Sequence, residues 1–293
     1  MTAFPLLGAS KVRLPREPYA LLIDFLSARF AAVGYQVWRQ RMLEGKVLDS
    51  EQRCLSPSAP YQAGALVYYF REVPEETPVP FHEQILHQDE HLVAVDKPHF
   101  LPTLPAGRYV EETLLRRLMR RLNNPDIAPI HRLDRLTAGV LLFSLKPSSR
   151  DAYQRLFREG KMFKCYEALA PALQNLHWPY RHRSRLEPAQ QFFRMQEVAG
   201  QANSDTVIEV QEQHGAVWRY RLYPVTGRKH QLRVHLAALG APIINDPWYP
   251  QLRHIPAQAA YQQPLKLLAK QISFVDPYSG VLRSFKSQIT LAL

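Results

Sequence analysis

One aspartate is the residue of this chain best placed to do chemistry. Asp134 lies between Arg132 and Arg135, directly before a turn and an apolar run. Two neighbouring cations favour the charged form of a carboxylate, so we expect Asp134 to be an anion at neutral pH. A fixed carboxylate anion can act as a nucleophile, a general base or a metal ligand. A structural alternative is a turn aspartate that pairs with one of the two arginines.

A second group of polar residues follows a glycine further along the chain. Gly227 allows a tight turn, after which residues 230–239 show the pattern of a helix with His230 and Arg233 near one face. Backbone N–H groups at the start of a helix attract anions, so this segment is a ready phosphate site. The basic and amide residues that form it are Arg228, Lys229, His230 and Gln231.

Three other chemistries lack the motifs that they need. His230 and His235 are five positions apart, which is not the spacing that places two imidazoles on one helix face, and no HExxH motif or third ligand accompanies them. A GxSxG nucleophile elbow is missing, and so are GxGxxG and Walker loops. The sequence therefore favours a function of Asp134 that uses neither a metal nor a cofactor.

The elements that must position these residues follow from periodicity and from capping residues. Strands are expected at 85–86, 91–95, 139–144, 161–170, 205–211 and 217–225, with a further strand closing the chain at 290–293. Helices are expected at 22–30, 37–45, 111–122, 148–160 and 230–239, and the basic run 181–185 is expected to be a loop. Helix 111–122 carries leucines on one face and four arginines on the other, which suits a solvated face and an RNA-tracking face equally.

The chain divides into two candidate domains. Residues 1–17 carry two prolines and no periodicity, which predicts an irregular lead-in, and residues 73–83 are rich in proline and glutamate, which predicts a stiff linker. Residues 18–72 resemble the RNA-binding module of the ribosomal protein S-four type, although Asp49-Ser50-Glu51-Gln52 replaces the Asn-Gly turn that such modules often carry. The alternative is a small helical cap without a ligand. Residues 84–293 form the larger domain.

The charge of the chain indicates a polyanionic partner. There are 37 basic and 26 acidic residues among 293, a formal net charge of +11, and nucleic acid is the commonest partner of such a protein. Two cysteines without CxxC spacing argue against a disulfide framework or a zinc finger. Neither a membrane-spanning run nor a signal sequence is evident, so we expect a cytoplasmic protein without a membrane or evident protein partner, and a monomer.

Three motifs together resemble the RluA-type RNA pseudouridine synthase family. They are His131-Arg132-Leu133-Asp134 with Thr137-x-Gly139, Lys164-x-Tyr166, and Thr226-Gly227-Arg228-x-His230-Gln231-Leu232-Arg233-x-His235 with Gly240-x-Pro242-Ile243-x-x-Asp246. Their order and spacing match over about residues 84–293. The resemblance implies an α+β fold with a mixed, mainly antiparallel sheet and flanking helices. It also implies isomerisation of uridine in structured RNA, ribosomal or transfer, without a cofactor.

The resemblance also implies roles for individual residues. Asp134 is then the nucleophile, Arg233 pairs with it, and Tyr166 stacks on the uracil and can receive the proton from its carbon-5. The target base is flipped out of its helix, and Arg132 or Leu133 fills the gap. Structural alternatives are a core strand residue for Tyr166, and a phosphate contact or a surface position for Arg233. Arg135 and the segment Arg228–Gln231 complete the expected RNA-binding residues.

Four departures from the family pattern leave the three catalytic positions untouched. They are Ala138 in place of serine, Asn245 and Pro250 in place of glycines, and Leu267-Leu268-Ala269 without the late histidine. Two competing functions are an RNA-binding or ribosome-assembly protein without catalysis, and a glycosidase. A glycosidase needs a pair of carboxylates, and no second one lies near Asp134 in the sequence.

Overall fold

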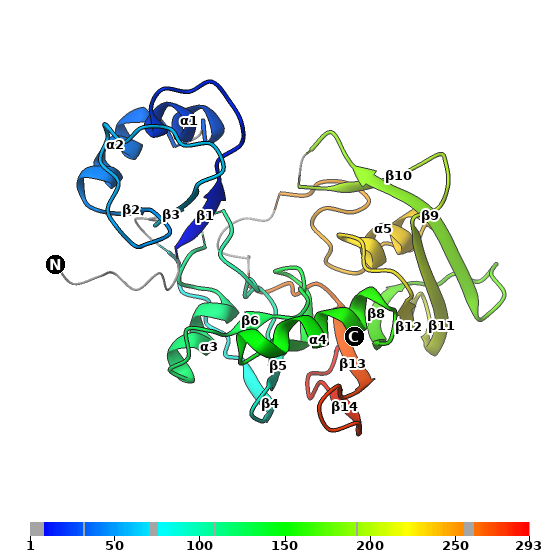
Figure 1. Cartoon of the computed structure of the whole chain (residues 1–293). Coiled ribbons are helices and arrows are strands. Elements are labelled where there is room, and N and C mark those ends of the chain that lie inside the picture. Colours follow the sequence, from blue (N-terminus) through cyan, green and yellow to red (C-terminus); the bar gives the residue numbers. More distant parts are fainter. Residues whose placement is uncertain are drawn as a thin grey trace. The chain divides into compact units, whose positions relative to one another are not determined.

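The computed structural model describes residues 9–31, 33–70, 76–107, 109–191, 193–254 and 261–292. The chain separates into two compact units, residues 1–76 and 77–293, which are described here one by one (Figure 1). None of the helices in the described ranges is long and apolar enough to cross a membrane.

The first unit packs two helices against a small antiparallel sheet in the strand order β1-β3-β2. Its elements are β1 (Ser10–Arg13), α1 (Leu22–Arg29), α2 (Tyr35–Leu43), β2 (Val47–Leu48) and β3 (Leu66–Tyr69). Trp38 is fully buried at the centre, where its ring meets the rings of Phe30 and Tyr69 at 5.6 and 5.1 Å. The two helices are present where the sequence predicts them.

The lead-in expected over residues 1–17 contains a strand, which corrects that prediction. Ser10–Arg13 pairs with Leu66–Tyr69 in antiparallel register, from Ser10 opposite Tyr69 to Arg13 opposite Leu66. The partner lies more than fifty residues away, so no local pattern of four residues could reveal the pairing. Part of the linker expected over residues 73–83 packs in the second unit, where Val79 is buried in the hydrophobic core, while residues 71–75 lie outside the described residues.

The second unit is built on one mixed sheet, as the sequence resemblance implies. Its main path is β10-β9-β11-β12-β8-β13-β7-β5-β4, with β14 beside β13 and β6 beside β7. All described strand pairs are antiparallel except β13 with β7. The strands are β4 (Gln84–Gln88), β5 (Leu92–Lys97), β6 (Ala128–Pro129), β7 (Ala138–Ser144), β8 (Phe163–Pro171), β9 (Tyr180–Pro188), β10 (Met195–Val198), β11 (Ser204–His214), β12 (Val217–Pro224), β13 (Leu267–Val275) and β14 (Leu282–Lys286).

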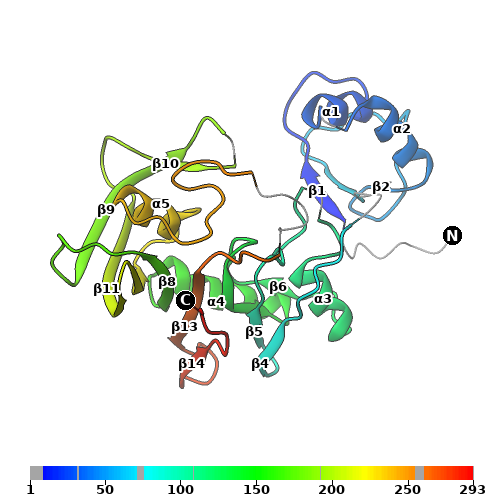
Figure 2. The ribbon, with the colours of Figure 1, turned by 180° about the vertical axis from the view of Figure 1, so that it is seen from behind.

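Three described helices flank this sheet: α3 (Leu114–Arg121), α4 (Pro147–Arg158) and α5 (Gln231–Ala238). Helix α5 lies beside β9 and β10 in both views, and α4 packs on β7 (Figure 1, Figure 2). Thr113 caps α3 by accepting a hydrogen bond from Arg116 N at 3.3 Å. The sequence left undecided whether the arginines of α3 face solvent or RNA. Two of them form ion pairs within the protein, Arg116 with Glu111 and Arg117 with Glu112.

Two predictions of secondary structure in the second unit are wrong. The basic run 181–185 lies inside β9, where alternation sends His182 and Ser184 to the other face of the strand from the three arginines. A loop was expected because arginines alone suggest solvent, whereas here the pairing with β11 forms the strand. Residues 290–292 are irregular, and the last strand, β14, ends at Lys286.

Gly139 is required where the parallel pair of strands meets. Its φ is +114°, and a Cβ atom there would lie 2.3 Å from the carbonyl oxygen of Ala269 on β13. Such a contact with backbone cannot be relieved by turning a side chain. Gly139 also follows the loop that carries Asp134, so this close packing places the loop against β13.

We expect Gly139→Ala to destabilise the protein by at least about 2 kcal/mol, since a strained φ and a backbone clash add together. Urea unfolding followed by circular dichroism measures the loss. Gly160→Ala is the matched control, because Gly160 has a positive φ of +67° but open space around its Cβ position. It should cost about 1 kcal/mol. Equal losses in the two variants would contradict the role assigned to the contact with Ala269.

Candidate active site

Asp134 lies in the loop between β6 and β7, and several hydrogen bonds hold this loop, among them the following three. The Asp134 carbonyl accepts from Thr137 N at 3.0 Å, and Thr103 Oγ1 donates to the Leu133 carbonyl at 2.8 Å. The buried amine of Lys97 donates to the Arg135 carbonyl at 3.2 Å. The Asp134 side chain is 30% exposed, so its carboxylate is both fixed in place and open to a ligand.

Arg233 joins Asp134 to a second, buried aspartate. Its Nη1 lies 3.3 Å from Asp134 Oδ2, while its Nε and Nη2 each donate to Asp246 at 2.7 Å. Burial alone would lower the pKa of Arg233, but the bonds to Asp246 and the nearby Asp134 hold the pKa above its usual value. Arg233 is 1% and Asp246 0% exposed. The two bonds to Asp246 orient the guanidinium of Arg233 so that its Nη1 faces Asp134. This is the pair of residues that the family resemblance implies.

His230 supplies a second neighbour to the same oxygen of Asp134. Tyr249 Oη accepts from Met195 N at 2.8 Å, so its own hydrogen is free to donate to His230 Nδ1, also at 2.8 Å. Burial lowers the pKa of His230 to about 4, so the ring is neutral and carries its proton on Nε2. Nε2 lies 3.8 Å from Asp134 Oδ2. Both neighbours face Oδ2, and Oδ1 has no hydrogen-bond partner among the described residues.

Tyr166, on β8, lines the same cavity as Asp134. Burial, and then the negative charge of Asp134, raise the pKa of its phenol above the usual value. The phenol is therefore protonated at neutral pH, which suits stacking or donation better than the acceptance of a proton. Tyr166 also packs against the main hydrophobic core. A position in the core and a stacking role are therefore compatible, because the same ring contacts the core and lines the cleft.

An open cleft of about 830 Å³ surrounds these groups. It brings together the Asp134 loop, the start of β8 and the start of α5, which are far apart in the sequence. The charged residues of its lining are six cations and a single acid: Arg132, Arg135, Lys164, Arg228, Lys229, Arg233 and Asp134. The cleft therefore favours an anionic ligand, and all ten site residues predicted from the sequence line it.

The predicted RNA-binding residues fall into two groups in the structure. Arg132, Arg228 and Lys229 are exposed, and no ion pair holds them within the described ranges. Gln231 is buried: its Oε1 accepts from Thr226 Oγ1 at 2.7 Å and its Nε2 donates to the Asp205 carbonyl at 3.0 Å. Gln231 thus fixes the turn before α5 and has little freedom to reach a ligand.

The two arginines next to Asp134 do not pair with it. Arg132 is exposed, and the guanidinium of Arg135 lies 5.8 Å from the ring centre of Tyr109. This geometry does not support the alternative of a turn aspartate paired with its neighbours. Leu133 is 7% exposed and belongs to the hydrophobic core, so Arg132 is the better placed of the two candidates for filling the gap left by a flipped base.

Sequence reasoning missed two residues that support the site. Asp246 appeared only as a position in a motif, and nothing in its neighbourhood indicates its bond to Arg233. Lys97 closes β5 and is fully buried, with its amine bonded to the carbonyls of Pro98, Leu101 and Arg135. Burial lowers the pKa of Lys97 to about 7, although the charge of Asp134 acts in the opposite direction.

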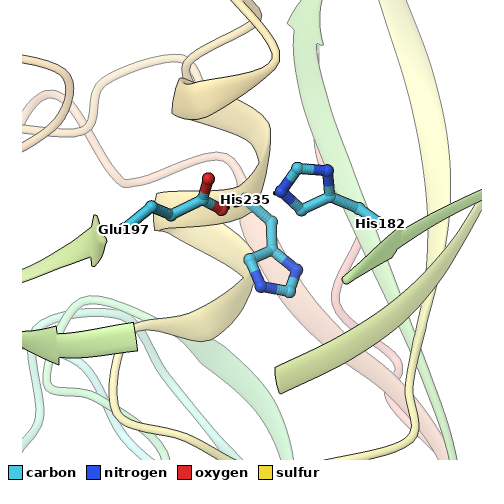
Figure 3. Close-up of side chains that lie close together, drawn as sticks. All are labelled: His182, Glu197 and His235. Atoms are coloured by element: carbon cyan, nitrogen blue, oxygen red, sulfur yellow. Dashed lines mark hydrogen bonds and ion pairs between the residues drawn. The ribbon is translucent and has the colours of Figure 1, made fainter. Parts of the chain in front are cut away.

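A cluster of His182, Glu197 and His235 has the composition of a metal site but is held by hydrogen bonds (Figure 3). His182 Nε2 lies 2.7 Å from Glu197 Oε1. Both ring nitrogens of His235 face hydroxyls, with Nε2 2.9 Å from Ser204 Oγ and Nδ1 3.0 Å from Thr206 Oγ1. A metal ion would have to displace these contacts, so we interpret the cluster as a network that anchors α5 to β9 and β11.

We expect stability to fall as the pH drops below 6.5. Burial lowers the pKa of His230 to about 4 and that of His235 to about 3, so the unfolded chain binds protons that the folded chain does not. Stability therefore decreases between pH 6.5 and 4, by about 3 kcal/mol for His230 alone. Urea unfolding at pH 7 and pH 5 measures the difference. In a His214→Gln control at the exposed β11–β12 turn, the difference should persist; equal stability at both pH values would refute the expectation.

The comparisons with known proteins agree on one family. Residues 91–238 match the family model described as RNA pseudouridylate synthase. An uncharacterized RNA pseudouridine synthase of Synechocystis is 31% identical over 245 residues, which cover 78% of this chain and 79% of that protein. The dual-specificity RNA pseudouridine synthase RluA of Escherichia coli is 31% identical over 221 residues, which cover 69% of this chain and 91% of that protein.

A solved structure supports the same relation. Human RNA pseudouridylate synthase domain containing 4 is 25% identical, with a TM-score of 0.54 over 70% of this chain and 88% of that one. A second human structure, RNA pseudouridylate synthase domain containing 1, has a TM-score of 0.56 and shares the fold at 22% identity.

Proposed function

The chain belongs to the RluA-type RNA pseudouridine synthase family, and we propose from this that Asp134 is the nucleophile with which it isomerises uridine in structured RNA to pseudouridine. The observation that carries the assignment is the Asp134 carboxylate itself. Arg233 and His230 face its Oδ2, Oδ1 has no hydrogen-bond partner among the described residues, and Asp134 lines the cleft. An oriented anion beside a sugar and a ring is what the reaction needs from the protein.

The reaction requires no atom that the protein and the RNA do not supply. The bond between ribose C1′ and uracil N1 breaks, the uracil turns, and C1′ joins carbon-5 of the ring. Carbon-5 then loses its hydrogen as a proton, and N1 gains one. Asp134 acts where C1′ and the ring separate, and Tyr166 lies against the uracil during the turn. Arg233, held in place by Asp246, orients the Asp134 carboxylate through Nη1 and stabilises its charged form.

The lining of the cleft supports a polymeric substrate over a free nucleoside. A free uridine is uncharged, whereas six cations line the cleft. Three of these cations are exposed to solvent: Arg132, Arg228 and Lys229. A uridine within a base-paired region must leave its stack to reach Asp134. In this proposal Arg132 enters the gap, and the segment before α5 contacts backbone phosphates through Arg228 and Lys229.

We extend the proposal to the class of RNA and to the place of action. The substrate is ribosomal or transfer RNA in the cytoplasm, and the protein acts as a monomer. In this proposal the small N-terminal unit, which consists of two helices and a small sheet, helps to choose the RNA. Mapping pseudouridines in cells with and without this gene identifies the RNA and tests the choice.

Release of tritium tests the activity. RNA transcribed with uridine tritiated at carbon-5 loses its label to water when C1′ joins that carbon, so the wild-type protein should release tritium from a mixture of ribosomal and transfer RNA. Binding of RNA without release would favour a non-catalytic RNA-binding protein. Efficient action on free uridine would favour a nucleosidase and overturn the polymeric substrate.

A further inference from the structure

Lys164 is a cation of the cleft, and no described residue provides it with a counter-ion. It lies on β8 two residues before Tyr166, so the alternation of the strand directs both side chains to the same face. Both residues line the cleft. Within the part of the chain that the structure describes, Lys164 forms no ion pair, and its hydrogen bond is a long one, 3.5 Å from Nζ to the Thr226 carbonyl.

The surroundings of Lys164 disfavour its charge. Burial lowers the pKa of Lys164 below the usual value, and the nearby ring of His131 is neutral because burial lowers its pKa to about 3. A partly buried amine without a counter-ion lowers the stability of the folded chain. Arg233, the other buried cation of the cleft, differs because Asp246 matches it with two hydrogen bonds.

We propose that Lys164 binds a backbone phosphate of the RNA next to the target uridine. A phosphate supplies Lys164 with the counter-ion that no described residue provides, and it would sit where desolvation makes a charged contact strong. Two residues along a strand span about 6.6 Å, so a uracil against Tyr166 leaves room for its own phosphate near Lys164. The proposal rests on the proposed function, because it takes the ligand of the cleft to be RNA.

The dependence of RNA binding on salt tests this contact. Each phosphate that a cation neutralises adds about 0.7 to the magnitude of the slope of log affinity against log salt for a single strand. We compare Asp134→Asn with Asp134→Asn/Lys164→Gln, using a fluorescein-labelled oligouridylate as the probe. The Lys164→Gln change should weaken binding severalfold at low salt and reduce the slope by about 0.7 to 1.

Lys161→Gln in the same background is the matched control. Lys161 precedes β8 by two residues, is 65% exposed and pairs with Glu159, so its loss should leave the slope unchanged. Thermal unfolding of Lys164→Gln adds a second measurement. Because the variant removes a charge that burial disfavours, its melting temperature should equal or exceed that of the wild type, whereas a structural lysine would lower it.

Three results would overturn the phosphate contact: an unchanged affinity and slope, weaker binding at an unchanged slope, or a lower melting temperature that accounts for the weaker binding. The second would assign Lys164 to the base and not to the backbone. Tritium release by the wild type is measured separately on transcribed RNA. A protein that shows the slope change but releases no tritium would keep this inference and lose the proposed function.

Discussion

Asp134→Asn is expected to lower the rate of tritium release at least about 10⁴-fold relative to the wild type. The amide keeps the size and the hydrogen-bonding oxygen of the side chain but cannot attack ribose or ring as an anion. RNA binding should persist, because the cations of the cleft remain in place. The variant therefore separates the chemistry from the capture of the substrate.

Asp126→Asn is the matched control for the loss of a carboxylate. Asp126 lies just before β6 and is exposed, so its replacement should leave tritium release and RNA binding unchanged. Thermal unfolding of both variants checks the fold. Tritium release by Asp134→Asn within tenfold of the wild type would remove Asp134 from the role of nucleophile.

Asp246→Asn has the second large expected effect, on stability and activity together. It leaves Arg233 without its fully buried partner and with only the part-exposed Asp134 nearby, and removing one partner of a buried pair costs about 3–5 kcal/mol. The side chain of Arg233 also loses the pair of charged hydrogen bonds that orients Nη1 towards Asp134. We therefore expect kcat to fall while KM changes less. Urea unfolding and tritium release measure the two effects.

Two further variants separate stability from catalysis at this pair. Asp205→Asn removes a carboxylate that is itself only 11% exposed, but its partner Arg181, held by similar bonds, is 58% exposed and stays hydrated, so the change should cost about 1 kcal/mol or less. The double replacement Arg233→Met/Asp246→Leu removes both charges and should regain much of the stability of Asp246→Asn without regaining activity. If the double variant regained activity too, Asp246 and Arg233 would be supports of the fold alone.

The local parts of the site could be predicted from the sequence, because each is a short segment. Asp134 before an apolar strand, Tyr166 on β8 and Arg233 on a helix are patterns of a few residues, and the structure places all three around one cleft. The mixed, mainly antiparallel sheet followed from the family resemblance and is confirmed. The domain boundaries proved less regular, since a strand lies in the expected lead-in.

What the sequence could not reveal depends on contacts between distant segments. No local pattern around Asp246 indicates its partner, and its role comes from the direction in which Arg233 points from α5. β9 looked like a loop because its arginines suggested solvent, while the pairing with β11 that makes it a strand is non-local. Which strands pair with one another depends on the packing of the whole sheet, and the residue types of one strand say little about its partner.

The central place of β13 makes the site a late product of folding. This strand lies between β7, which follows Asp134, and β8, which carries Tyr166, yet it is synthesised long after both. Pairings between distant segments form slowly because the loop between them must first close. During synthesis Asp134 and Tyr166 therefore have no fixed separation until β13 leaves the ribosome and inserts. A nascent chain can attract RNA by its charge well before it can modify it.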